Sequence, residues 1–480
     1  NSQFSTVLRK QSQIRVRNSR MTAACACYSW TFNALTEGSQ LLIVNSTLFA
    51  AGQGGCALMS FSGSIQDGSS IVIDTSYLDV ATRYNTATLF SMQGSILRGS
   101  MISVLRSTLS SRAYEARPDT EEACTFCGSG QFSGSKLTVD GSTISSSPPH
   151  YDRSGAFQFP TVLDGSEWRV SATVFTARSM AINGRIRASN VTFSDGTTLT
   201  EFNVNTVDVG VVLHVDDASD VNTTNALTRE PAALRGASLV SLPAGRLICD
   251  RWTLPVIDLT AGPFYDVAFS GCAVTDMLTG RAFNQGASPP ARDSVFVARG
   301  ETFITTFSLR WAVINMSFSM SENSFFDFVE FTNDVINSTI AIADVVHTTS
   351  RSGVVRGSDS LGFMGSLTGS SVTMTNVTVY VQEPQTCRLF NFMGSVTGSR
   401  LTFLGVNALV SSNFNVARLL YFHEELVDVQ LYIADSTFTA SIQRHDTAND
   451  FTYVLNGRKG LTGTTVTLLL LPPVIPCLKF

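Results

Sequence analysis

The chain has 480 residues and a formal net charge of −5, and charged residues make up only 15% of it, against roughly 25% in an average soluble protein. This length accommodates two or three ordinary domains or one solenoid. The small negative charge provides no basic field, so we expect no nucleic-acid partner. The absence of any run of 18 or more apolar residues predicts no transmembrane helix.

A Gly-Ser pair opens each of several similar segments in the first part of the chain, residues 1–196. A short alternation rich in β-branched residues follows each pair, such as LTV or IVI, which is typical of a half-buried strand. The repeating unit is therefore about thirty residues long, and we expect the same fold in each unit. The pairs begin at Gly38, Gly68, Gly99, Gly134 and Gly165, at steps of 30, 31, 35 and 31 residues.

The turns within each unit are also predictable. Glycine permits a positive φ at a sharp corner, and the serine after it closes the turn with a local hydrogen bond. Asn or Asp often stands six or seven residues after the marker glycine, and we expect the chain to bend there because these residues tolerate left-handed backbone. A second short strand then follows, as in STLF. The predicted bends are at Asn45, Asp74, Asp140, Asn376 and Asp435.

The middle of the chain, residues 197–297, lacks the marker pair. Prolines and charges interrupt it, as in LTREPAALRGASLVSLPAGRLICDRWTLP and GASPPARDS. We interpret this region as irregular coils with long loop insertions; a domain boundary is the alternative. One continuous solenoid is the preferred interpretation.

The repeat resumes in residues 298–480. FMGSLTGSSVTMTNVTVYV begins at Phe363, and FMGSVTGSRLTFLGVNALV begins 29 positions later, at Phe392. A leucine-rich repeat would need a periodic leucine framework, which this chain lacks. The units instead predict an all-β fold, a right-handed parallel β-helix solenoid with coils of about 30 residues.

Units of the form GSxLTVxxSTF, with serine-rich turns and interspersed FMGS, resemble the dispersed gene family surface proteins of trypanosomes and related kinetoplastids. The likeness covers most of the chain outside the central region. It implies a β-helical, pectate-lyase-like ectodomain of a large surface glycoprotein. This chain is far shorter than those proteins and lacks the membrane segments expected near their C-terminus. The resemblance therefore implies an ectodomain or part of one.

Six Asn-X-Ser/Thr sequons are candidates for N-glycosylation, which would place the chain in the secretory route. Some of these asparagines occupy the predicted turn position, where an unmodified Asn has a purely structural role. The six are Asn45, Asn190, Asn222, Asn315, Asn337 and Asn376.

The nine cysteines indicate an oxidising compartment only weakly. Cys124 and Cys127 form CTFC, the spacing of half a zinc ribbon or of a redox pair, but no second pair follows at a metal-binding distance. We predict a local disulfide in a loop there, with Cys25 and Cys27 as further disulfide candidates. Cys272 is expected to be a small apolar residue inside the coil. No metal and no cofactor are predicted.

β-Helices also carry polysaccharide-cleaving enzymes, which place several carboxylates together on adjacent coils. The most suitable pair in this chain is Asp216 and Asp217 in VLHVDDASD, near His214. The GHG and RIK patterns of galacturonases are absent. A carbohydrate-active enzyme of the pectate-lyase or galacturonase kind, with Asp216 and Asp217 as catalytic residues, is therefore the alternative hypothesis; a solvated loop is the simpler interpretation.

The preferred hypothesis is a non-enzymatic protein, located outside the cell or on its surface. It would be a rigid rod for adhesion or for structural assembly in a filament. Outward Ser and Thr faces suit surface carbohydrate or neighbouring protein chains. Open coil ends would permit a homopolymer or heteropolymer, because unprotected strand edges add further strands.

Overall fold

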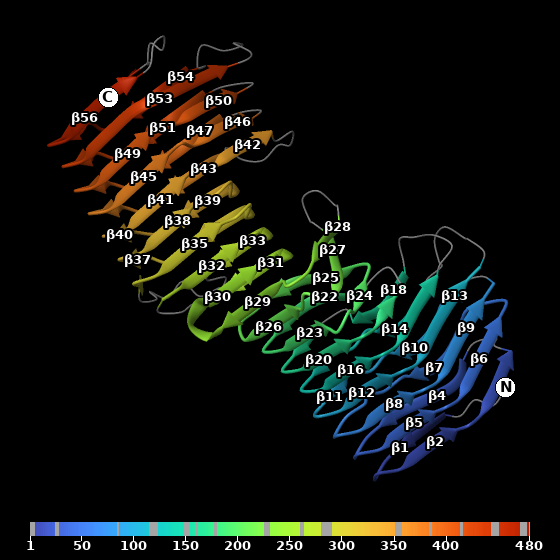
Figure 1. Cartoon of the computed structure of the whole chain (residues 1–480). Coiled ribbons are helices and arrows are strands. Elements are labelled where there is room, and N and C mark those ends of the chain that lie inside the picture. The colour runs from blue at the N-terminus through green and yellow to red at the C-terminus, as the bar shows by residue number, and fades with distance from the viewer. Residues whose placement is uncertain are drawn as a thin grey trace. The chain divides into compact units, whose positions relative to one another are not determined.

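The computed structural model describes residues 5–24, 28–83, 86–114, 123–147, 154–159, 162–176, 180–224, 231–259, 264–279, 290–350, 358–383, 386–412, 416–442, 451–470 and 478–479. In these residues all regular structure is strand, apart from one 3-10 turn at Pro243–Gly245. Strands of successive coils lie parallel and in register (Figure 1). The predicted all-β parallel β-helix solenoid is confirmed. Within the described ranges, no helix is long and apolar enough to span a membrane.

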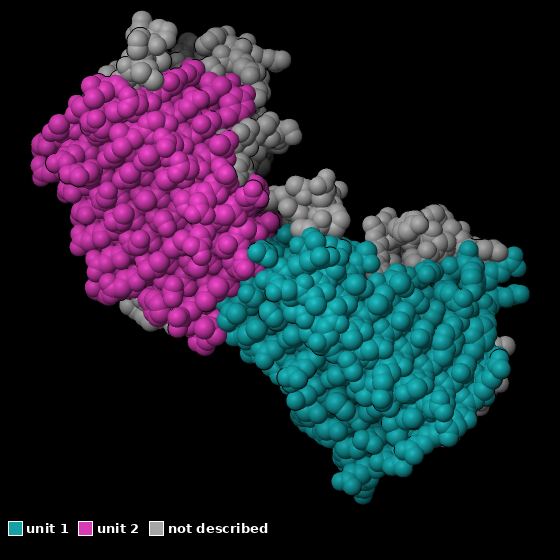
Figure 2. Space-filling view, viewed as in Figure 1, with its two compact units in different colours: residues 1–241, 251–255 teal, residues 242–250, 256–480 magenta. Residues whose placement is uncertain are grey.

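The chain forms two compact units, which are coloured separately in Figure 2. Unit 1 comprises residues 1–241 and 251–255, and unit 2 comprises residues 242–250 and 256–480. The division falls inside the region 197–297 that the sequence marks as irregular.

The strands as far as residue 242 are β1 (Ser5–Leu8), β2 (Gln13–Arg17), β3 (Arg20–Ala24), β4 (Tyr28–Leu35), β5 (Gln40–Val44), β6 (Thr47–Gly52), β7 (Cys56–Phe61), β8 (Ser70–Asp74), β9 (Tyr77–Thr82), β10 (Ala87–Met92), β11 (Ile96–Leu97), β12 (Met101–Leu105), β13 (Thr108–Ala113), β14 (Ala123–Gly128), β15 (Phe132–Ser133), β16 (Lys136–Asp140), β17 (Thr143–Ser147), β18 (Ser154–Phe159), β19 (Val162–Asp164), β20 (Glu167–Ser171), β21 (Val174–Phe175), β22 (Met180–Arg187), β23 (Asn190–Ser194), β24 (Thr198–Leu199), β25 (Phe202–Val207), β26 (Val211–Val215), β27 (Asp220–Thr224), β28 (Pro231–Leu234) and β29 (Ser238–Leu242).

The later strands are β30 (Arg246–Asp250), β31 (Thr253–Leu259), β32 (Asp266–Ser270), β33 (Ala273–Thr279), β34 (Ala291–Arg292), β35 (Val295–Arg299), β36 (Phe303–Leu309), β37 (Val313–Ile314), β38 (Ser317–Met320), β39 (Phe325–Phe331), β40 (Val335–Ile336), β41 (Thr339–Ala343), β42 (Val346–Ser350), β43 (Ser358–Phe363), β44 (Leu367–Thr368), β45 (Ser371–Thr375), β46 (Thr378–Glu383), β47 (Thr386–Phe392), β48 (Val396–Thr397), β49 (Arg400–Leu404), β50 (Asn407–Ser412), β51 (Val416–Phe422), β52 (Leu426–Val427), β53 (Gln430–Ile442), β54 (Phe451–Gly457), β55 (Leu461–Thr462), β56 (Thr465–Leu470) and β57 (Leu478–Lys479).

Each coil of unit 1 contributes strands to three stacked sheets. Strands β7, β8 and β9 of one coil pair in parallel with β10, β12 and β13 of the next. From Ser46 to Thr173, equivalent residues of successive coils lie 30, 31, 35 and 31 positions apart in the sequence, as predicted. The distance then falls to 23 and 22, so the prediction of about 30 residues for every coil is wrong for these later ones.

The core of unit 1 consists of columns of identical or similar side chains from successive coils. Leu41, Ile71 and Ile102 lie in register and are fully buried. Phe90 and Phe157 stack on either side of Phe126, with ring centroids 4.5 and 4.6 Å apart. Burying one such side chain contributes about 1.5–3 kcal/mol, so the columns are the main source of stability.

Unit 2 shows why FMGSxTGS occurs twice. Phe363 and Phe392 stack at 5.0 Å with rings nearly parallel. A Cβ on Gly394 would meet the backbone of Gly365, so this position needs glycine because two coils approach closely. The second glycine of each motif, Gly369 or Gly398, has φ +58 or +57, as predicted for the marker position. Each glycine of the motif therefore has a separate physical cause.

Serine after the marker glycine links neighbouring coils. In unit 2 the Ser338 amide donates to Ser370 Oγ at 3.0 Å, and the Ser370 amide donates to Ser399 Oγ at 3.1 Å. Each hydroxyl also donates to a carbonyl two residues earlier in its own coil; Ser370 Oγ reaches Thr368 O at 2.9 Å. The serine hydroxyl therefore closes its own turn, as predicted, and also accepts a hydrogen bond from the backbone of the preceding coil.

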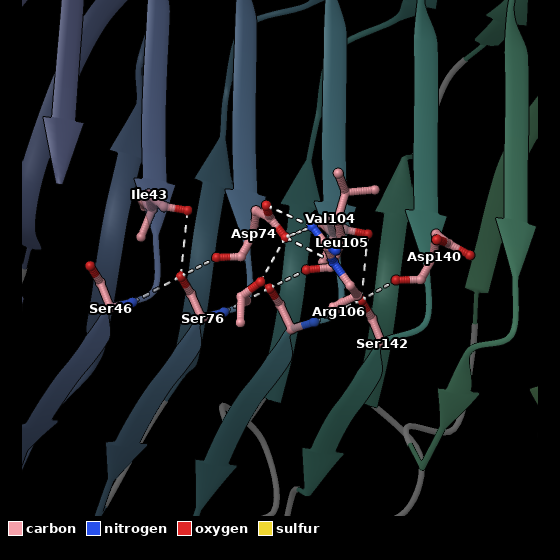
Figure 3. Close-up of polar contacts among 11 residues, drawn as sticks. Ile43, Ser46, Asp74, Ser76, Val104, Leu105, Arg106, Asp140 and Ser142 are labelled. Carbon is pink, nitrogen blue, oxygen red and sulfur yellow. Dashed lines mark hydrogen bonds and ion pairs between the residues drawn. The ribbon is translucent and has the colours of Figure 1, made fainter. Parts of the chain in front are cut away.

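Figure 3 shows the corresponding ladder at another corner, in unit 1. The Ser46 amide donates to Ser76 Oγ at 3.2 Å, the Ser76 amide to Ser107 Oγ at 3.0 Å, and the Ser107 amide to Ser142 Oγ at 3.1 Å. All four serines are buried. Because a buried amide without a partner would be costly, these bonds fix the register of the coils at about 1 kcal/mol each.

The predicted bends are correct at three positions and displaced at two. Asn45, Asn376 and Asp435 have positive φ. Asp74 and Asp140 instead end their strands, and the residue after each is left-handed, Thr75 in one coil and Gly141 in the other. The carboxylate of Asp74 remains outside the turn, where Arg106 donates to it at 2.8 Å.

The irregular region contains the antiparallel pairings of the described strands. β26 pairs antiparallel with β29, and β27 pairs antiparallel with β28. Parallel stacking continues on the other side of β26, where it pairs with β23. β26 therefore stacks on the preceding coil as in a β-helix, whereas its pairing with β29 departs from that architecture.

Candidate functional site

Asp216, the first carboxylate of the candidate catalytic pair, lies in the turn after β26. Its Oδ1 accepts the amide of Ser219 at 2.8 Å, and its Oδ2 accepts the amide of Asp195, on the preceding coil, at 2.8 Å. Burial alone would raise the pKa of Asp216, but hydrogen bonds from the Ser219 side chain and from these amides lower it. The carboxylate is thus held ionised and serves to fix the turn.

Asp217 and His214 lie close by in the chain but have different surroundings. Asp217 is exposed, and its Oδ1 lies against Gly236. His214 is exposed on β26, in register with Thr192 on one side and Ser238 on the other. Nowhere among the described residues do three His, Cys, Asp or Glu side chains gather in a way that would hold a metal ion. The alternative enzymatic hypothesis stays a prediction, and the bonding of Asp216 accounts for that residue without catalysis.

Five of the six sequon asparagines are exposed, namely Asn45, Asn190, Asn315, Asn337 and Asn376. Asn222 is half-buried within β27. Three of the exposed side-chain amides bridge coils: Asn45 Nδ2 donates to Asn18 at 2.8 Å, Asn315 to Asp293 at 3.1 Å, and Asn376 to Asp344 at 3.2 Å. The structural role expected for a turn Asn is therefore present, and glycosylation stays a prediction.

The cysteines form disulfides within the described residues. The predicted Cys124–Cys127 disulfide is present, but it lies in strand β14, not in a loop. Cys272 is buried as predicted, yet it is bonded to Cys249, 23 residues earlier. Its environment in the sequence, FSGCAV, gives no sign of this partner because β30 and β32 bring the two residues together. Cys56 is disulfide-bonded as well. Cys25 and Cys27 lie outside the described residues.

Most ion pairs join one coil to the next. Arg106 bonds Asp74, Lys136 bonds Glu167 at 3.0 Å, and Arg187 bonds Asp164 at 2.6 Å. A hydrogen bond from Arg187 lowers the pKa of Asp164, and one from Lys136 lowers the pKa of Glu167. These ionisable groups therefore contribute to coil stacking.

Sequence reasoning missed one cluster on the outer face of unit 1. Asp79 is almost completely buried, with 2% of its side chain exposed, and it pairs with Arg112 of the next coil. Arg112 also lies over the ring of Tyr114, at 5.8 Å from its centroid. Burial, together with the charge of Asp79, raises the pKa of Tyr77. The only sequence signal is the spacing of Tyr77 and Asp79 in one strand, which directs both to the same face.

A second unpredicted cluster lies in unit 2 at the turn after β51. Glu424 accepts Lys459 at 2.5 Å and His423 at 3.0 Å, and these two hydrogen bonds lower its pKa, that from Lys459 the more strongly. Thr462 donates to Glu425 in the same turn. Like most ion pairs among the described residues, the pair of Lys459 and Glu424 connects one coil to the next.

No protein-family model matches the chain, and no curated protein matches it. The resemblance to kinetoplastid surface proteins therefore stays a prediction.

Proposed function

We propose that this protein is a non-enzymatic structural protein of the cell exterior, a rigid β-solenoid used for adhesion or for assembly. The observation that carries the proposal is the use of polar side chains to join coils. Buried serines form hydrogen-bonded ladders in both units, and carboxylates pair with basic residues of adjacent coils. A scaffold needs such joints because rigidity requires each coil to be fixed to the next.

Two further observations support a location outside the cell. The described disulfides Cys124–Cys127 and Cys249–Cys272 suit an oxidising compartment. Five of the six sequon asparagines are exposed at turns or strand ends, where an attached sugar would meet no core residue. Both observations support the proposal of a secreted or surface-displayed solenoid.

Coil ends provide a route to assembly. Ile14 and Val16 of β2 are only half-buried, whereas their partners Leu41 and Ile43 on β5 are fully buried. On β56, Val466 and Leu468 are likewise half-buried. Apolar residues at such edges favour the addition of a further strand. We propose that another chain, or more coils of the same chain, supplies it, while the Ser and Thr faces contact surface carbohydrate or neighbouring chains.

The test is peptide mapping and intact mass of protein purified from its native source, with and without glycosidase. We expect sugar on exposed sequon asparagines, none on the half-buried Asn222, and intact Cys124–Cys127 and Cys249–Cys272 disulfides. Asn222 serves as the internal control because it shares the sequon but not the exposure. Unmodified asparagines together with free thiols at these four cysteines would contradict the proposal.

A further inference from the structure

One corner of unit 2 places equivalent residues of successive coils above one another, each with positive φ. At most positions of this column the residue is Asn or Asp, whose side chain can cover the outside of a corner; for example, Asn337 Oδ1 lies 2.5 Å from the place that a Cβ on Gly369 would occupy. Glycine stands twice in succession in the middle of the column. The members are Asp293, Asn315, Asn337, Gly369, Gly398, Asp428 and Gly463.

The two adjacent glycines leave a hollow. Its volume is about 310 Å³, and its walls include Ser371, Arg400, Asp428 and Gln430. A Cβ built on Gly398 would meet nothing within 4 Å. The hollow therefore exists because the coil of Gly398 has no side chain at this position of the column. The next coil has Asp428 at the same position, and the coil two before it has Asn337.

The walls combine hydrogen-bond donors with an acceptor. Arg400 Nε and Nη2 donate to Gln430 Oε1 at 3.2 and 3.1 Å, which uses two of the five N–H groups of the guanidinium. This contact also orients the Gln430 side chain, whose amide nitrogen is a further donor. Asp428 also lines the hollow and is the carboxylate acceptor of its wall; the Oδ1 atom lies toward Gly463 of the following coil. Arg400, Asp428 and Gln430 are all exposed. The residues lining the hollow are thus polar and carry no net charge.

These features select the ligand. An anion would be attracted by Arg400 but repelled by Asp428. A cation would be attracted by Asp428 but repelled by Arg400. A neutral molecule with several hydroxyl groups can both accept from Arg400 and Gln430 and donate to Asp428. The volume is at the lower end of small-molecule sites, which begin at about 300 Å³, so one sugar residue is a better fit than a longer oligosaccharide.

We propose that this hollow is a binding site for one neutral saccharide residue. The proposal rests on the extracellular function above, since it names the class of ligand that an adhesive solenoid would hold. The sugar has two possible sources, namely another molecule or a glycan attached to Asn337, whose side chain lies at the edge of the hollow.

The first experiment is saturation-transfer NMR of the full chain, made without glycans, with N-acetylglucosamine, galactose or methyl sulfate as the probe; methyl sulfate is an anion with observable methyl protons. We expect a signal from at least one sugar and none from methyl sulfate. In Gly398→Asn the added side chain fills the hollow, and Asn tolerates this φ, as Asn315 and Asn337 do in the same column. Gly68→Asn is the matched control, because Gly68 has a positive φ and nothing within 4 Å of its Cβ. Only G398N should lose the sugar signal.

A second variant tests the chemistry without altering the corner. Arg400→Met keeps an unbranched apolar stem and removes the guanidinium donors. It should weaken sugar binding about tenfold, the effect of losing a hydrogen bond from a charged group. Thermal unfolding verifies that each variant is folded. Absence of sugar binding to the unaltered chain, binding that G398N and R400M leave unchanged, or a signal from methyl sulfate alone would overturn the proposal.

The two sources of sugar are distinguished with the glycosylated chain. If the chain's own glycan occupies the hollow, added sugar binds only after Thr339→Ala removes the sequon of Asn337. If the ligand comes from elsewhere, added sugar binds the glycosylated chain directly. Failure of the hollow to bind sugar leaves the native glycan and disulfide mapping unaffected, so it is distinguishable from failure of the proposed function.

Discussion

The regular coils and the irregular region between residues 197 and 297 stabilise the same architecture by different means. In the regular coils, rings at equivalent positions of successive coils stack almost parallel, with interplanar angles of 4° and 7° for Phe90, Phe126 and Phe157. In and near the irregular region, Phe193–Phe202 and Phe202–Trp252 meet edge to face, at 71° and 67°. A disulfide, Cys249–Cys272, closes adjacent coils there.

The difference follows from repetition. Strands one coil apart are separated by about 4.7–4.9 Å, close to the 4.5–5.1 Å between the stacked phenylalanine centroids. Rings can stack only where every coil presents phenylalanine at the same position, and the same applies to the serine ladders. Where the repeat is lost, register must be fixed by individual contacts. We therefore expect the irregular region to depend on its disulfide more than the regular coils depend on theirs.

The largest expected effect is that of replacing both Cys249 and Cys272 by alanine. This disulfide closes 23 residues, and the loss should lower the free energy of unfolding by about 3 kcal/mol because the unfolded chain gains loop entropy. The matched control replaces Cys124 and Cys127, which lie three residues apart in a regular coil, and should cost about half as much. Denaturant unfolding measures both. Equal losses, or a larger one for the control, would show that the two regions do not differ in this way.

The second prediction concerns the close approach of regular coils. A Cβ on Gly394 would lie 2.3–2.4 Å from backbone atoms of Gly365, so Gly394→Ala should cost about 2–3 kcal/mol by forcing the coils apart. Gly54→Ala is the control, since nothing lies within 4 Å of its Cβ, and its stability should change by less than about 1 kcal/mol. The unfolding midpoints of the two variants in denaturant compare the costs. A tolerated G394A would mean that the coils can separate locally without loss of stacking.

Sequence alone gave the fold because each unit repeats residues whose physical roles are local. A positive φ at Gly38 or Gly398 follows from the turn that glycine permits, and the alternation after it follows from a half-buried strand. The prediction failed where a role depends on another coil. Asp74 resembles a turn residue, but its carboxylate is used by Arg106, 32 positions later. Likewise, the partner of Cys272 and the Asp79–Arg112 pair depend on register, which a single segment does not specify.

The hollow at Gly398 has the same origin. The sequence marks Gly398 as a turn position, yet the hollow depends on the neighbouring positions of the column, Gly369 and Asp428, which belong to different coils. Coil lengths of 22 and 32 residues within the same column, and of 23 residues in unit 1, mean that a constant step of about 30 residues does not predict that alignment. The candidate site therefore depends on how neighbouring coils align, whereas the fold follows from the residues of each single unit.

The smallest expected effect lies at the transition between the two regions, where the step between coils first shortens to 23 residues and Arg187 bonds Asp164. Arg187 lowers the pKa of Asp164 in the folded state. The pair therefore stabilises the protein at pH values above the ordinary pKa of aspartate, about 3.9. That contribution is lost as the pH falls through the lowered, folded-state pKa. Arg187→Met should therefore reduce stability at neutral pH only slightly, since 60% of the arginine side chain is exposed and solvent screens the pair.

The sign of this pH dependence separates the pair from a merely apolar contact of the arginine stem. Unfolding of R187M and of the unaltered chain should differ at about pH 7 and converge as Asp164 becomes protonated in both. Arg98→Met is the matched control within the regular coils, because its pair with Asp67 is longer, 3.4 Å, and more exposed; its effect should be smaller at every pH. If the difference in unfolding free energy between R187M and the unaltered chain persists unchanged at acidic pH, the stabilisation comes from packing of the arginine stem. The ion pair would then make no contribution to stability at this transition.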